Sequence, residues 1–138
     1  MATMYTNSED LGKLILRISL GVTILLHGIS KLIGGVDGII GMVEKSGMPG
    51  VFGYLVYLGE VLAPLLLIVG LWTRLAALVI VGNMVVAVVL AHMADLFTLT
   101  KQGGWALELQ GMFLFTALAL ALLGAGRFSV GGARGRFN

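Results

Sequence analysis

The feature that most constrains this chain is the run from Leu75 to Ala94, LAALVIVGNMVVAVVLAHMA, which holds no Asp, Glu, Lys or Arg. At about 1.5 Å per residue, a helix of this length crosses the roughly 30 Å of hydrocarbon in a bilayer. In lipid, every backbone polar group needs a partner within the protein, so a spanning segment is a helix or a strand of a closed barrel. The run does not alternate polar and apolar residues, and it therefore predicts a membrane-spanning helix.

Three further apolar stretches complete a predicted set of four spans. They cover residues of about 14–31, 51–71 and 105–123, and the run described above is the third span, 75–94. Composition agrees, because 58% of the residues are hydrophobic and only 12% are charged, against about 25% charged in soluble domains. We expect one all-α domain over residues 1–138, a polytopic four-helix bundle in the lipid bilayer.

The connections between the spans are predicted to differ in length and structure. Residues 32–50 are rich in glycine, and within them Ile39, Ile40 and Val43 could form one apolar side of a short interfacial helix. A tight turn at residues 72–74 joins the second span to the third.

Lys and Arg positions predict the orientation in the membrane. Six of them lie on the side that holds both chain ends and the turn at 72–74, and three lie on the other side. An excess of Lys and Arg marks the cytoplasmic side, so we expect both termini in the cytoplasm and read Arg17, Arg74 and Arg127 as anchors there. The start, MATMYTNSED, lacks the basic region of a secretory signal. The net charge of +2, with scattered basic residues, argues against nucleic-acid binding.

Five ionisable side chains fall in the predicted outer half of the bundle: His27, Lys31, Glu60, His92 and Glu108. Counting about 1.5 Å per residue from each helix end places Glu60 and His27 deepest and the other three nearer the outer surface. An acid near the middle of the bilayer costs about 2.5–3.5 kcal/mol on insertion scales. Glu60 has no basic residue one turn away on its own helix. We therefore predict that it contacts His27, directly or through water.

These positions define the candidate site. Glu60 and His27 are the candidate catalytic residues, because a carboxyl group and an imidazole can hold and pass protons. Lys31, His92 and Glu108, at the mouth, are the candidate substrate-binding residues. The alternative is structural: Glu60 as glue between helices, Lys31 as a snorkelling end residue, and His92 and Glu108 as interfacial charges.

Two residue patterns predict how the first two spans meet. Gly21 and Gly28 lie on one stripe of the first helix, which would let another helix approach closely. Pro64 cannot donate to the carbonyl of Glu60, so we expect the second helix to be disturbed there.

No cofactor is encoded by a motif. The absence of cysteine excludes disulfides, cysteine-ligated iron–sulfur clusters and covalent c-type haem. Haem b between the two histidines is disfavoured, since their depths differ by roughly 5 Å. A metal site built from His27, Glu60, His92 and Glu108 has suitable ligand types but no spacing motif, so we expect no metal. Any electron carrier would then belong to a partner protein.

Several runs resemble the DoxX family of small bacterial membrane proteins: LGKLILRISLGVTILLHGISKLIGG, SGMPG, GEVLAPLLLIVGLWTRLAAL, WALELQGMFLF and LLGAGRFSV. The resemblance extends from about Leu11 to Val130. It implies a four-helix bundle in the bacterial cytoplasmic (inner) membrane. Some relatives are linked to quinone-dependent oxidation of sulfur compounds, as the small partner of a thiosulfate:quinone oxidoreductase, and others to oxidative-stress complexes. Family members often continue the last run to an Asp, where this chain has Gly131 and Gly132.

Two functions follow as hypotheses. In the first, the chain is a subunit of a quinone-linked oxidoreductase, with an outer-half site for a quinone headgroup, proton transfer at that site, and a redox partner docked on the outer face. In the second, it is a non-catalytic structural or assembly subunit of a larger membrane complex. A transporter ranks below both, because no inverted repeat is visible. The sequence leaves open whether copies of the chain form an oligomer.

Overall fold

The structure, a computed structural model, describes residues 2–138, with side chains from Asn7 onward. Within that range the chain is helical and contains no strand beyond an isolated bridge between Leu99 and Trp105. The helical elements are α1 (Ala2–Gly34), α2 (Asp37–Lys45), η1 (Gly50–Leu55), η2 (Leu58–Leu62), α3 (Ala63–Val69), α4 (Thr73–Ala87), η3 (Val88–His92), η4 (Met93–Asp95) and α5 (Glu108–Leu123).

The predicted helical membrane bundle is confirmed. Among the described residues, three stretches are long and apolar enough to cross a membrane: Asn7–Gly34, Gly50–Val69 and Thr73–Asp95. The fourth, α5, is apolar but shorter, at 16 residues. Residues 105–107, which were expected to begin the fourth span, lie in the loop before α5. The helix thus starts later than the apolar composition suggests.

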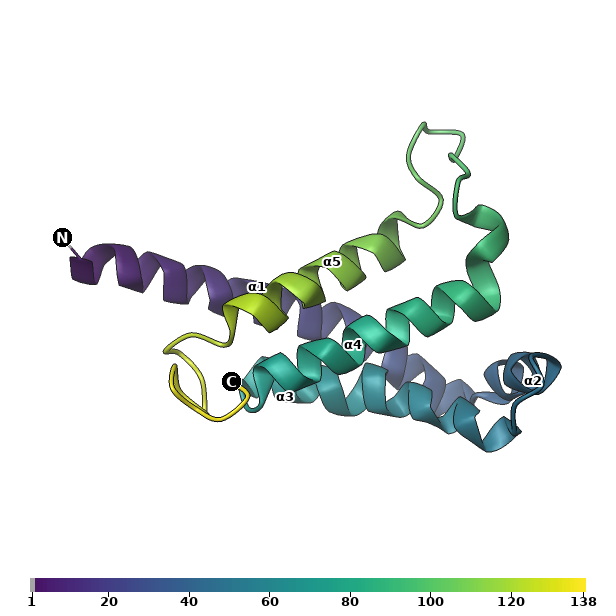
Figure 1. Ribbon diagram of the computed structural model, residues 1–138, viewed down its shortest axis with the longest axis horizontal. Helices are drawn as coiled ribbons and strands as arrows, with labels where there is room; N and C mark the ends of the chain where they lie inside the picture. Colours follow the sequence, from purple (N-terminus) through teal and green to yellow (C-terminus); the bar gives the residue numbers. More distant parts are fainter. Residues whose placement is uncertain (1) are drawn as a thin grey trace.

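Figure 1 shows which ends of the helices lie together. The start of α1, the turn between α3 and α4, and the segment 124–138 lie at one end, here called the turn end. The helix α2 and the loop 96–107 lie at the other, here called the loop end. The predicted grouping of both chain ends with the turn at 72–74 is confirmed. That the turn end faces the cytoplasm remains a prediction.

A compact apolar core forms where α1, α3, α4 and α5 meet. Small residues such as Ala63, Ala77 and Ala117 are almost fully buried in it, beside larger ones such as Leu67 and Ile80. Many large apolar side chains on the same helices are exposed instead. An apolar outer surface of this extent is what a bilayer requires and what water would oppose.

Glycines let α1 lie directly against η2 and α3, as the stripe on the first helix predicted. A Cβ added at Gly28 would lie 2.1 Å from the carbonyl oxygen of Glu60, and one at Gly21 would lie 2.7 Å from Ile68 Cγ1. The predicted disturbance near Pro64 is also present, as the π-helical turn η2. Pro64 cannot bond to the Glu60 carbonyl, and the wider turn presents that carbonyl to Gly28.

The helix expected within residues 32–50 is present as α2. Its Val43 is buried, and its Ile40 packs against Gly53, where an added Cβ would lie 2.9 Å from Ile40 Cγ1. The helix α2 therefore folds back on η1 at the loop end.

Segment 124–138 closes the turn end of the bundle, a feature that the sequence did not predict. Arg17, expected to be an anchor at the cytoplasmic side, is 1% exposed. Its Nη1 donates to the carbonyl of Ala125 at 2.9 Å and its Nη2 to that of Phe128 at 3.0 Å. The side-chain oxygen of Asn138 accepts from the backbone N–H of Thr73 at 3.0 Å. The segment thus satisfies the Arg17 guanidinium in the middle of α1 and a backbone N–H at the start of α4.

Candidate functional site

The centre of the candidate site is an ion pair between α1 and η2. Lys31 Nζ donates to Oε2 of Glu60, whose residue is only 7% exposed. The Lys31 side chain is 27% exposed, so its ammonium group lies at the edge of the buried region. The pair joins two of the five residues that the sequence singled out, and it gives Glu60 the partner from another helix that its depth requires.

The partner of Glu60 was predicted to be His27, and that prediction of a direct contact is wrong. No hydrogen bond or ion pair between the described residues joins the two side chains. His27 instead packs edge-on against Phe113 of α5, with ring centroids 5.8 Å apart and an interplanar angle of 80°. The residue is exposed despite this contact.

The direction of the side chains explains why Lys31 takes this place. Helical side chains lean toward the N-terminus of their own helix. The helix α1 runs from the turn end to the loop end (Figure 1). Its side chains therefore lean toward the turn end, and Lys31 reaches back to donate to Glu60. The segment with η2 runs the opposite way, so Glu60 leans toward the loop end and meets it. The depth estimate counted backbone positions alone. It left out the distance that a side chain extends along its helix, which is large for lysine.

Two backbone contacts between α1 and the segment with η2 flank the Lys31–Glu60 pair. Tyr57 Oη donates to the carbonyl of Lys31 at 3.0 Å, which fixes the end of α1 to the start of η2. One turn earlier, Gly28 lies against the Glu60 carbonyl. The pair is therefore positioned by close packing of two helices and not by its own attraction alone. A π-helical turn at this point is notable, because such turns are frequent at functional sites.

The other two candidates do not join the pair. His92 ends η3, and its Nδ1 lies 3.9 Å from Oδ2 of Asp95, three residues along the chain. Glu108, the first residue of α5, is exposed and lies over Gly104, where an added Cβ would be 2.1 Å from Glu108 Oε1. The predicted mouth of Lys31, His92 and Glu108 is thus not assembled by any hydrogen bond or ion pair of the described residues.

The alternative of a metal site gains no support from the geometry. Within the part of the chain that the structure describes, no three His, Cys, Asp or Glu side chains are grouped so as to hold a metal ion.

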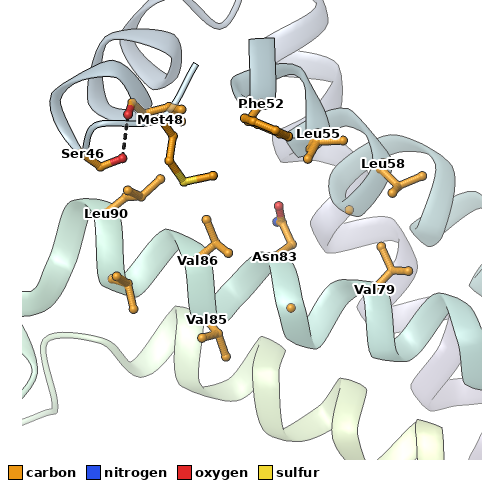
Figure 2. A pocket seen from close by; sticks show the side chains of 14 residues that line it. Ser46, Met48, Phe52, Leu55, Leu58, Val79, Asn83, Val85, Val86 and Leu90 are labelled. Carbon is orange, nitrogen blue, oxygen red and sulfur yellow. Dashed lines mark hydrogen bonds between the residues drawn. The ribbon is translucent and has the colours of Figure 1, made fainter. Parts of the chain in front are cut away.

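Sequence reasoning missed a cavity of about 440 Å³ between α4 and η3 on one side and the α2–η1 region on the other (Figure 2). Its lining is almost wholly apolar, and Asn83 and Ser46 are its polar side chains. Asn83 was visible in the sequence as a lone amide inside an apolar span. Nothing in the sequence showed that it faces a cavity. The apolar lining includes Phe52, Leu55, Leu58, Val79, Val86 and Leu90.

Comparison with known proteins identifies the family to which the sequence is similar. The sequence profile of the DoxX family matches residues 12–93, more than half of the chain. Over 118 residues the chain is 28% identical to a protein of Bacillus subtilis (strain 168) named "Putative oxidoreductase CatD". That match covers 86% of this chain and 83% of the relative. No solved structure matches the chain at a significant level.

Proposed function

We propose, since the chain belongs to the DoxX family, that it is the membrane subunit of a quinone-linked oxidoreductase and that the Lys31–Glu60 pair supplies protons to the quinone. The relative named as an oxidoreductase supports the reaction class. The observation that carries the proposal is the pair itself, a buried acid and an ammonium group in contact between two membrane helices. Ionisable groups at such depth are costly and are functional sites by default.

In quinone reduction this chain needs to supply only protons. A quinone that becomes a quinol gains two electrons and two protons. The electrons come from a donor through a partner protein, because a chain without cysteine has no thiol or cysteine-bound cluster to carry them. The Lys31–Glu60 contact holds a proton between two heteroatoms, and in an apolar site such a proton can pass to a reduced quinone oxygen. His27, one turn before Lys31 on α1, is the second proton carrier in this proposal.

The position of the pair suits exchange of protons with one side of the membrane. Lys31 is part-exposed near the loop end, whereas Glu60 is buried deeper in the bundle. Lys31 therefore takes up replacement protons from the loop side, and the redox partner docks at that end. If the turn end is cytoplasmic, as the basic residues predict, the loop end faces outward from the inner membrane.

The test is quinone reduction by membranes or by purified protein together with its co-purifying partners, with thiosulfate as the first donor. We expect Glu60→Gln to abolish quinone reduction while the protein still inserts and accumulates. Glu9→Gln, the same acid-to-amide change at an exposed position of α1, is the matched control and should behave as the unaltered chain. Full activity in Glu60→Gln would refute the proposal.

One observation favours the second candidate function, a structural or assembly subunit. In the structure Lys31 and Glu60 neutralise each other, as internal glue between helices would. In that case partner proteins co-purify in fixed ratio, and quinone reduction by the assembled complex is unchanged by Glu60→Gln. The same experiment thus separates the two functions.

A further inference from the structure

The cavity beside α4 contains a polar group that the fold leaves unpaired. Of its two polar side chains, Ser46 already donates from Oγ to the carbonyl of Val43 at 2.6 Å. The Asn83 amide forms no hydrogen bond with any residue that the structure describes. It lies in the middle of the helical stretch Thr73–Asp95, away from the ends where a free amide could cap the backbone.

The surroundings hold the amide toward the cavity. Gly59 of η2 lies directly against Asn83, since a Cβ at Gly59 would be 2.5 Å from Asn83 Cβ. In Figure 2 the amide points from α4 into the space below Met48 and Phe52. A primary amide without a partner in an apolar setting costs about 1–3 kcal/mol. An apolar residue would avoid that cost, so the amide is best explained by a ligand that it binds.

The shape and the lining narrow the chemistry of that ligand. A volume of about 440 Å³ lies within the range of small-molecule sites, roughly 300–1,000 Å³. One amide on an otherwise apolar wall suits a molecule with one hydrogen-bonding group on a hydrophobic body. Val86 and Leu55, which line the cavity, are each more than half exposed, so the cavity is open to its surroundings. A lipid-soluble molecule can therefore enter it from the bilayer.

We infer that this cavity binds the ring of a lipid-soluble quinone, with the Asn83 amide N–H donating to one ring carbonyl. The inference rests on the proposed function and locates its substrate. A phospholipid fits less well, because its acyl chains offer the amide no acceptor at this depth. Gly59, in the cavity wall, directly precedes Glu60. The ring thus lies against Gly59, one residue from the Glu60 of the pair that supplies its protons.

Photolabelling with an azido derivative of a short-chain ubiquinone, on the purified full chain in nanodiscs, tests the inference. The expected labelled peptides come from the cavity wall, within residues 46–59 or 79–90. Asn83→Leu, which keeps the size but removes the hydrogen bonds, should lower the affinity for the unlabelled quinone about tenfold. Labelling elsewhere, or unchanged affinity in Asn83→Leu, would overturn the inference.

A second variant blocks the cavity without touching Asn83. An added Cβ at Gly82, a lining residue, meets nothing within 4 Å, so Gly82→Leu begins its side chain in open space beside the cavity. It should abolish cavity labelling. Gly12→Leu, at another helical glycine with open space around it, is the matched control and should label normally. An alkylbenzene with the same tail but no carbonyl should compete poorly with the azido-quinone. If it competed as well as the unlabelled quinone, the cavity would be a site for hydrocarbon chains, and the quinone site would be refuted.

The two proposals can fail separately. If Glu60→Gln abolishes quinone reduction while Asn83→Leu binds and reduces quinone normally, the function stands and the site is wrong. If the cavity binds quinone through Asn83 but Glu60→Gln is fully active, the site stands and the role of the pair is wrong.

Discussion

Replacement of Lys31 by Met should reveal how strongly Glu60 depends on its partner. The variant keeps most of the apolar stem of the side chain and removes the ammonium group. Glu60, 7% exposed, would then be an acid buried without a counter-charge. Breaking a fully buried ion pair from one side costs about 3–5 kcal/mol. Because the Lys31 side chain is 27% exposed, part of the attraction is screened, and we expect the lower end of this range, about 3 kcal/mol.

The reverse change should cost less. In Glu60→Gln the ammonium group loses its partner but can turn toward the loop end, since lysine snorkels readily. We expect a cost of about 1 kcal/mol. In the double variant Lys31→Met with Glu60→Gln no charge is left buried, so its stability should exceed that of Lys31→Met alone.

The assay is equilibrium unfolding of the purified protein in mixed micelles, by titration with a denaturing detergent and helical circular dichroism. Lys101→Met, at an exposed position of the loop 96–107, is the control and should change the free energy of unfolding by less than about 0.5 kcal/mol. Strictly additive losses in the double variant would refute the reasoning, because they would mean that Lys31 and Glu60 do not interact.

Two further predictions concern packing that the structure shows to be tight. Gly28→Ala should destabilise the bundle by about 1–3 kcal/mol, since its Cβ would meet the Glu60 carbonyl at 2.1 Å; Gly12→Ala, in open space, should be neutral or stabilising in the same unfolding assay. Arg17→Lys should release segment 124–138, because a single ammonium group cannot reproduce the two guanidinium hydrogen bonds to the carbonyls of Ala125 and Phe128. Faster trypsin cleavage within the segment would show this release. An unchanged cleavage rate would mean that Arg17 does not hold the segment in place.

The spans were predictable because the bilayer imposes a simple rule on the sequence. A long apolar run such as 75–94 has few structural options, and a stripe such as Gly21 and Gly28 has a direct steric meaning. Those expectations needed only residue type and spacing. The late start of α5 was not predictable from composition, because residues 105–107 are compatible with a helix but belong to the preceding loop.

The candidate site was predictable in its residue types and not in its contacts. Glu60 was recognisable as a candidate because an acid at that depth in the bilayer is energetically costly. Its partner depended on the lean of each side chain and on the π-helical turn η2, which residue counting does not capture. Arg17 was misread for a similar reason, since the carbonyls that it binds are more than 100 residues away in the chain.

Proton transfer from Glu60 to the quinone is tested most directly by the infrared difference spectrum between the oxidised and reduced states of the quinone-loaded complex. We expect a carboxyl band that changes on quinone reduction, because Glu60 exchanges its proton when the quinone takes one up. That band should be missing in Glu60→Gln and present in Glu9→Gln. Identical carboxyl bands in the unaltered chain and in Glu60→Gln would show that Glu60 takes no part in the proton transfer.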